Sequence, residues 1–307
     1  MTRRQALVLL AAPPPDRAHS HRPFRRTSAW PGPGFEANGP FEIKVQGKPA
    51  KVVGWKDADS DLLLLVVFDL TGDLTLADAA RQSLLAEIQK LPGNAWVGLL
   101  RAQDGLQVLL DPTPDRAAAE QAVSSLAING RANLLDSLEP AALLASRLLA
   151  KTGVRTAVLC ISDSNIYNYR EDYTNPVINY SDSRDLSRRF PEALIREKTA
   201  KVAAVLAELD APVFTAHVAF LRDRLNEAYQ TGLNQIMQAT GGEALFARAQ
   251  TEIAGMIAAA MQKIRSMWAV DFEIPADTPK NFTIELSAGT AQLNYRSRFA
   301  LRSRKRE

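Results

Sequence analysis

The stretch Leu62-Leu63-Leu64-Leu65-Val66-Val67-Phe68-Asp69 decides the fold. Seven consecutive apolar residues that end in an acid are typical of a strand buried on both faces, as in a parallel sheet covered by helices. A second such run, residues 156–161, is followed by Ser162-Asp163. With helical patterns between the strands, right-handed crossovers follow. The sequence therefore predicts an α/β fold with a doubly wound, mostly parallel sheet and helices on both faces.

Local signals mark the elements around these two strands. Apolar residues at spacings of four and three predict a helix after the first strand, with Thr75 as its N-cap. Asp104-Gly105 between two apolar runs predicts a β-hairpin. Gly241-Gly242 is expected to end a late helix. These elements extend the α/β domain over residues 60–268.

The two ends of the chain differ in character from this domain. Residues 41–57 alternate like a β-hairpin, and residues 269–303 contain β-like runs that we expect to pack with it as flanking antiparallel strands. Residues 1–40 are rich in proline and arginine and are predicted to be a signal-like or disordered arm. The arginine residues near both ends, including Arg25, Arg26 and Arg296, are expected to be solvated.

Composition limits the classes of partner and compartment. The net charge of +3 over 307 residues does not favour nucleic acid, and no segment has the length of a transmembrane helix. Arg3-Arg4 before a short apolar run, residues 6–12, resembles a twin-arginine export signal, so an exported and a cytoplasmic protein both remain open. The single cysteine, Cys160, is expected to be buried and unreactive.

Oxygen-bearing side chains follow both apolar runs. In open α/β sheets ligands bind at the carboxyl ends of the strands, where Asp69, Thr71, Asp73 and Asp163 would meet. Carboxylate and hydroxyl oxygens suit a hard divalent cation such as Mg²⁺. These four residues are the candidate metal ligands.

The order of these motifs resembles that of von Willebrand factor A (VWA) domains. Asp69-x-Thr71-x-Asp73 resembles their Asp-x-Ser-x-Ser element, and Ser162-Asp163 resembles their Ser-Asp-Gly element. Residues 130–136 resemble the intervening Gly-Gly-Thr-x-Leu-x-Asp-Ala loop, and residues 240–242 resemble the end of a late helix. The flanking β-segments resemble the VWA-related proteins of acidobacteria. The resemblance covers about residues 61–268.

The resemblance implies a metal-ion-dependent adhesion site, with Mg²⁺ or Mn²⁺ bridging to a partner carboxylate. The site departs from the family pattern, because Ala132 stands at the threonine position and Asp73 at the second serine. Asn133, next to Ala132, offers an amide oxygen in its place. Two outcomes remain open: a cation relieves the repulsion among three carboxylates, or the site holds no metal and Asp73 caps the following helix.

A tyrosine-rich segment follows Asp163. It contains Tyr167, Tyr169, Tyr173 and Tyr180 among several asparagine residues, a mixture that favours protein recognition. With no nucleophile elbow or phosphate loop, the sequence predicts a non-enzymatic protein-interaction module whose partner it does not name. The alternatives are a metal-dependent hydrolase that uses Asp69 and a structural relic that binds nothing. His217 is expected to be a core histidine rather than a catalytic one.

Overall fold

The computed structural model describes residues 24–32, 35, 41–169 and 191–301. A six-stranded sheet with the order β10-β9-β8-β5-β6-β7 forms the centre of the molecule. Its strands are β5 (Leu62–Asp69), β6 (Ala95–Arg101), β7 (Gln107–Thr113), β8 (Arg155–Ser162), β9 (Val213–His217) and β10 (Ala244–Phe246). The pairs among β10, β9, β8, β5 and β6 are parallel, and β7 is antiparallel to β6. The predicted fold class is confirmed.

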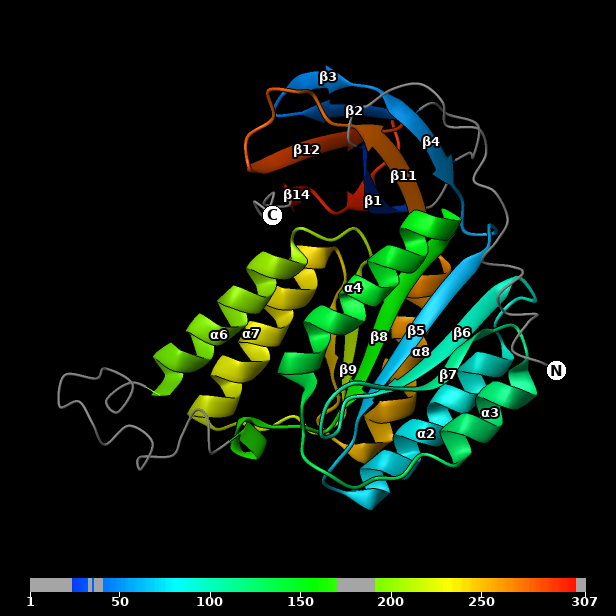
Figure 1. Cartoon of the computed structure of the whole chain (residues 1–307), viewed down its shortest axis with the longest axis vertical. Coiled ribbons are helices and arrows are strands. Elements are labelled where there is room, and N and C mark those ends of the chain that lie inside the picture. The colour runs from blue at the N-terminus through cyan, green and yellow to red at the C-terminus, as the bar shows by residue number, and fades with distance from the viewer. Residues whose placement is uncertain (1–23, 33–34, 36–40, 170–190, 302–307) are drawn as a thin grey trace.

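Helices cover both faces of this sheet (Figure 1). One face packs against α2 (Leu74–Gln89), α3 (Arg116–Ser124) and α8 (Ile253–Arg265). The other packs against α4 (Leu134–Thr152), α6 (Pro191–Leu206) and α7 (Arg224–Thr240). Two short 3₁₀ turns, η1 (Ile166–Tyr169) and η3 (Gln250–Glu252), complete this domain. None of the described helices is long and apolar enough to cross a membrane.

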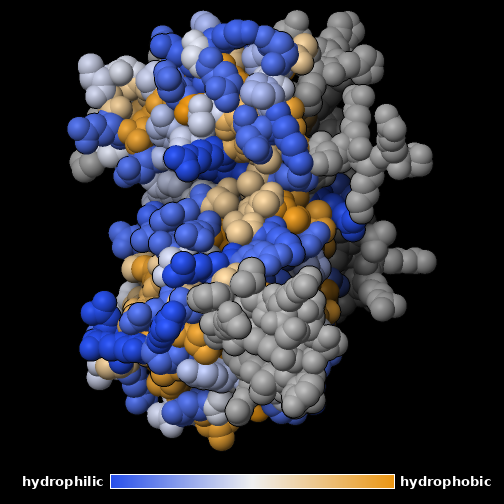
Figure 2. Space-filling view, turned by 90° about the vertical axis from the view of Figure 1, so that its left-hand side faces the viewer, coloured by the Kyte–Doolittle hydropathy of each residue, from blue (hydrophilic) through white to orange (hydrophobic). Residues whose placement is uncertain are grey.

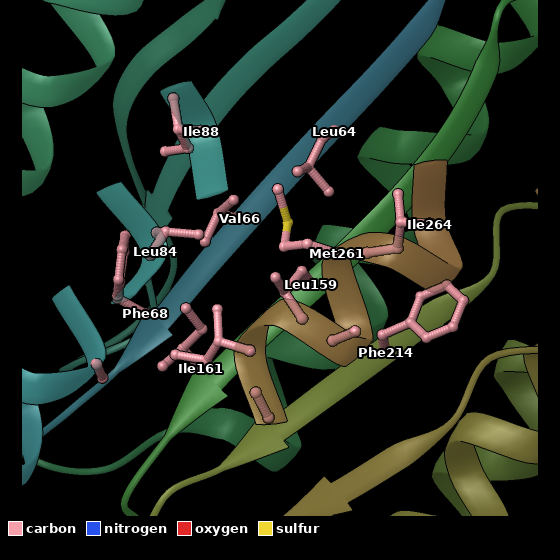
Figure 3. Packing of buried hydrophobic residues seen from close by; sticks show 14 of the residues in the cluster. Leu64, Val66, Phe68, Leu84, Ile88, Leu159, Ile161, Phe214, Met261 and Ile264 are labelled. Carbon is pink, nitrogen blue, oxygen red and sulfur yellow. The ribbon is translucent and has the colours of Figure 1, made fainter. Parts of the chain in front are cut away.

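The unbroken apolar runs supply both cores because successive side chains on a strand point to opposite faces. Every residue of β5 and of β8 is buried. Leu64 and Val66 face α2 and α8, whereas Leu63 and Leu65 face α4 and the helices beside it. Figure 3 shows the first of these cores, in which α2 contributes Leu84 and Ile88 and α8 contributes Met261 and Ile264.

The remaining strands form two antiparallel sheets, which we call the β-module. Their orders are β13-β1-β11-β4 and β14-β12-β2-β3. The strands are β1 (Phe24–Pro31), β2 (Glu42–Val45), β3 (Lys48–Ala50), β4 (Val52–Lys56), β11 (Trp268–Glu273), β12 (Asn281–Ser287), β13 (Leu293–Tyr295) and β14 (Arg298–Ala300). β12 pairs with β2, and β11 pairs with β4, so segments from before and after the α/β domain share both sheets.

The interpretation of residues 1–40 as an arm is wrong for its last part. Residues 24–31 form β1, which lies between β11 and β13. Five of its residues are buried, among them Arg25 and Arg26. The prolines and arginines led to the prediction of an arm, because both residue types are more common in solvated segments than in buried strands.

Buried arginines join the β-module to the α/β domain, which corrects the expectation that they are solvated. Arg26 forms a bidentate ion pair with Asp271 at 2.6 and 2.8 Å and donates to the carbonyls of Gly153 and Val154, just after α4. Arg25 pairs with Asp210 and donates to Ala300 O at 2.7 Å. Arg296 donates to the carbonyls of Ala207 and Leu209, just after α6. Guanidinium groups thus satisfy carbonyls at the negative ends of two helices.

Arg155 plays the same role at the end of α8. Its buried guanidinium donates to Arg265 O and Met267 O at 3.0 and 2.7 Å, and to Ala58 O and Ser60 O in the segment before β5. Burial lowers the pKa of Arg155, and nearby aspartates oppose this. These contacts lie where the parallel strands begin, so the β-module covers that end of the sheet and leaves the opposite end open (Figure 1). On the face that carries α6 and α7, apolar residues gather between the two parts (Figure 2).

Candidate functional site at the carboxyl edge of the sheet

Asp69 lies at the centre of the candidate site, at the end of β5, and is fully buried. Its Oδ1 accepts the backbone N–H of Asn133 at 3.0 Å, and its Oδ2 accepts the hydroxyl of Ser162 at 3.2 Å. The residue therefore ties the start of α4 and the end of β8 to β5. Both carboxylate oxygens are engaged within the protein.

Burial raises the pKa of Asp69 from 3.8 to about 6. The carboxylate of Asp163 raises the pKa as well, whereas the hydrogen bonds from Asn133 and from the hydroxyls of Ser164 and Ser162 lower it. Desolvation outweighs these hydrogen bonds at Asp69, because the carboxyl group is fully buried and only one of its donors is a backbone N–H. The protein thus holds an acid that changes charge near pH 6.

Asp163 binds the loop that connects β5 to α2. Its Oδ1 accepts the N–H of Thr71 at 2.8 Å and its Oδ2 accepts the N–H of Gly72 at 2.7 Å. A Cβ at position 72 would lie 3.2 Å from Oδ2, so glycine permits the close approach. Asp163 is nearly buried, and its own N–H donates to Asp69 O. The two acidic residues hold adjacent loops in one fixed arrangement.

A buried polar chain extends from Asp69 behind the site. The hydroxyls of Ser162 and Ser164 are 2.7 Å apart, and that of Ser164 is 3.1 Å from the hydroxyl of Tyr229 on α7. His217 Nε2 donates to Ser164 O at 2.6 Å, while Nδ1 has no partner among the described residues. Burial lowers the pKa of His217, although its hydrogen bond and Asp163 raise it. His217 is thus a neutral core residue that supports the Asp163 loop, as expected.

The structure does not bring Asp73 together with Asp69 and Asp163. Asp73 is exposed and accepts the N–H groups of Thr75 and Leu76, so Asp73 rather than Thr75 is the N-cap of α2. Within the described ranges, no three His, Cys, Asp or Glu side chains are grouped to hold a metal ion. Of the two roles left open for Asp73, the structure shows the helix cap.

The residues between α3 and α4 also depart from a ligand role. Ala132 is buried and brings no oxygen, and the amide nitrogen of Asn133 donates to Ser137 Oγ at 3.1 Å. Asn133 therefore reaches Asp69 through its backbone N–H and not through its amide oxygen. Among the candidate ligands, only Thr71 has a buried side-chain oxygen without a partner in the described part of the chain.

These contacts do not fit a divalent cation as the side chains stand. A hard cation needs about six oxygen ligands. The oxygens of Asp69 and Asp163 accept N–H and O–H groups, Asp73 caps a helix, and Ala132 offers none. Fewer than the four expected side-chain ligands therefore meet at this edge of the sheet.

Tyr167 is the described part of the predicted recognition loop. It is 47% exposed, and its hydroxyl donates to Asp223, the N-cap of α7, at 2.9 Å. This hydrogen bond raises the pKa of Tyr167. Tyr169 ends η1, and Tyr173 and Tyr180 lie outside the described residues. Ile166 is buried, and its N–H donates to Asn226, so η1 is anchored to α7.

Three contributors to the site escaped the sequence analysis. Gly72 is needed for the close approach of Asp163, and Ser164 and Tyr229 complete the polar chain. Ser164 follows Asp163 directly, so its place at the edge could have been inferred. Tyr229 gave no such signal, because it lies 65 residues from Ser164 on a helix that looks merely amphipathic.

The sheet order, the antiparallel edge strand β7 and the acids at the carboxyl ends of β5 and β8 agree with the VWA-type α/β fold that the sequence predicted. No protein-family model matches the chain, and no curated protein matches it. It is similar in structure to a von Willebrand factor type A protein from Catenulispora acidiphila, with a TM-score of 0.48 and 11% identity over 88% of this chain and 76% of that one.

Two further structures are similar to the chain at comparable identity. The PilB minor pilin from Streptococcus sanguinis has a TM-score of 0.48 and 15% identity over 71% of this chain and 64% of that one. The vWF domain of the type V pili tip protein Mfa5 from Porphyromonas gingivalis has a TM-score of 0.43 and 12% identity over 67% and 95% of the two chains.

Proposed function

We propose that the chain is a non-catalytic protein-binding module that uses the carboxyl edge of its parallel sheet. The observation that carries this proposal is the combination of a buried, hydrogen-bonded polar frame with exposed apolar side chains that follow the loops it holds. Leu74 is 63% exposed and Tyr167 is 47% exposed, and they follow the two loops that Asp163 joins. Binding sites of this kind place adaptable contacts on loops that a rigid scaffold holds.

The rigid frame lowers the cost of binding. Asp163 fixes the loop before Leu74, and Asn226 and Asp223 fix the turn that carries Tyr167. A side chain that is already ordered loses little conformational entropy when a partner covers it. Exposed tyrosine in particular supplies a large contact area with few rotatable bonds.

Binding in this proposal does not depend on Mg²⁺ or Mn²⁺. Asp69 and Asp163 act by fixing loops through hydrogen bonds. The buried carboxylate of Asp69 also makes a poor nucleophile, because its oxygens are engaged and no water or substrate reaches a fully buried group. This arrangement does not favour the hydrolase.

Site-specific crosslinking tests the proposal. A photoreactive phenylalanine derivative is placed at position 74 or 167 of the full chain, with position 285 on the exposed face of β12 as the control, in cells of the source organism. We expect the same protein to be captured from positions 74 and 167 and not from position 285. Binding of that purified protein should then fall about tenfold for Tyr167→Ser, persist in EDTA, and be unchanged for Glu285→Ser.

Other outcomes would point elsewhere. Binding lost in EDTA and restored by Mn²⁺ would replace our view with a metal-dependent contact. Turnover of a phosphoester that disappears in Asp69→Asn would favour the hydrolase. Capture of nothing from either edge position would leave a structural relic.

A further inference from the structure

The loops after β9 and β10 carry a row of aromatic contacts that ends at an arginine. The ring of His217 lies 5.7 Å from that of Phe246, which lies 5.9 Å from that of Phe220. The guanidinium of Arg248 lies 5.5 Å from the centroid of Phe220. A buried histidine, two half-buried phenylalanines and an exposed arginine thus form a continuous path from the core to the surface.

The two loops that carry these rings are joined by a backbone hydrogen bond. Phe220 N–H donates to Ala247 O at 3.1 Å. The side chain of Gln230, which is buried on α7, accepts the N–H of Leu221 at 3.2 Å and donates to its carbonyl at 2.8 Å. Arg222 follows Leu221, whose N–H and carbonyl are both bonded to Gln230. Arg248 follows Ala247, whose carbonyl accepts the N–H of Phe220. We call Phe220, Arg222, Phe246 and Arg248 the arginine shelf.

The acidic side chains near the arginine shelf bind other groups. Asp223 caps α7, and Glu252 accepts the backbone N–H of Arg248 at 2.8 Å. Glu192 pairs with the neighbouring Arg224. Arg222 and Arg248 are exposed, and neither forms an ion pair with any residue that the structure describes. Two exposed guanidinium groups on adjoining loops thus have no carboxylate partner among the residues that the structure describes.

We infer that the arginine shelf binds an acidic segment of a partner protein through its carboxylate side chains. A guanidinium in cation–π contact with an aromatic ring, as that of Arg248 is with Phe220, keeps N–H groups free to bind the two oxygens of a carboxylate. The contact with Phe220 also restricts Arg248, so less side-chain entropy is lost on binding. Two arginines give too few phosphate contacts to hold a nucleic acid at physiological salt, which agrees with the low net charge.

This inference specifies the chemistry of the partner in the proposed function. It rests on that function only for the choice of the carboxyl edge of the sheet as the binding surface. The shelf lies on the loops after β9 and β10, apart from Asp69 and Asp163. An acidic peptide probes the shelf without the natural partner. A failure of the shelf to bind the peptide would therefore not affect the crosslinking result at positions 74 and 167. A failure of the crosslinking would likewise not affect peptide binding at the shelf.

The test uses fluorescein-labelled hexaglutamate and fluorescence anisotropy at low salt, with the full chain and with EDTA present. We expect saturable binding that Arg222→Ala and Arg248→Ala each weaken about tenfold, as for loss of one charge-assisted hydrogen-bonded pair. Arg248→Lys should weaken binding as well, because lysine keeps the charge and loses the fork. The matched control is Arg224→Ala, which removes the same charge from a neighbouring but already paired arginine.

Three results would overturn the inference. The first is no binding of hexaglutamate by the native chain. The second is a loss with Arg224→Ala as large as that with Arg222→Ala, which would reduce the effect to general charge. The third is tighter binding of a labelled hexathymidylate than of hexaglutamate, which would assign the shelf to nucleic acid.

Discussion

Replacing Asp69 by asparagine is expected to stabilise the protein at neutral pH, although the residue lies at the centre of the candidate site. Asparagine has the same shape, and its oxygen can accept the N–H of Asn133. Its amide nitrogen can donate to Ser162, whose hydroxyl now donates to Asp69 and can also accept. The substitution therefore removes a buried charge and keeps both hydrogen bonds.

The magnitude follows from the pKa of Asp69, which burial raises from 3.8 to about 6. The folded state binds the proton more tightly than the unfolded state, so ionisation opposes folding. The contribution to stability is fully present below pH 3.8 and is lost as the pH rises through about 6. The difference between these pKa values corresponds to about 3 kcal/mol, an upper bound for the gain in Asp69→Asn at pH 8.

Urea denaturation of both proteins from pH 4 to pH 8 measures this gain. The free energy of unfolding of the variant minus that of the native chain should be small at pH 4 and should grow through pH 6 to a plateau. Asp111→Asn makes the same chemical change at an exposed position of β7 and should give a flat difference within about 0.5 kcal/mol. A variant that is less stable than the native chain at pH 8, or a difference independent of pH, would refute the reasoning.

Three further substitutions test other parts of the structure. Arg155→Met should lower the free energy of unfolding by about 3–5 kcal/mol, because it leaves buried carbonyls without donors. Urea denaturation measures this loss, and the control Arg147→Met, at an exposed position, should change the free energy of unfolding little. Gly242→Ala should prevent accumulation of soluble protein, because a Cβ there would lie 1.8 Å from Val213 O, and a thermal melt that matches the native one would contradict this. Asp73→Ala should cost about 1 kcal/mol as the loss of an N-cap and should leave any heat of Mn²⁺ binding in calorimetry unchanged.

The central sheet could be predicted because its evidence is local. Two apolar runs became β5 and β8, Asp104-Gly105 became the turn between β6 and β7, and Gly241 became the left-handed end of α7. Strand β1 could not be predicted in this way. Its pairing partners lie about 240 to 270 residues away, and its arginines bind carbonyls just after α4, just after α6 and in β14, which no local sequence pattern connects to this strand.

The candidate site was predicted in its position but not in its bonding. The order of the strands requires Asp69 and Asp163 to meet at one edge, and they do. The donors that Asp163 accepts depend on the backbone path of two residues, Thr71 and Gly72, which the sequence does not fix. The sequence could not decide the role of Asp73 either, because a helix cap and a metal ligand use the same side-chain oxygens.

The position of β1 has a consequence for synthesis. Residues 24–31 leave the ribosome before the rest of the described chain, yet both neighbours of this strand, β11 and β13, are translated only after the whole α/β domain. Contacts between such distant segments form slowly, because a long loop must close first. The α/β domain can assemble while β1 has no strand to pair with, and the β-module closes only once β11 and β13 have been translated.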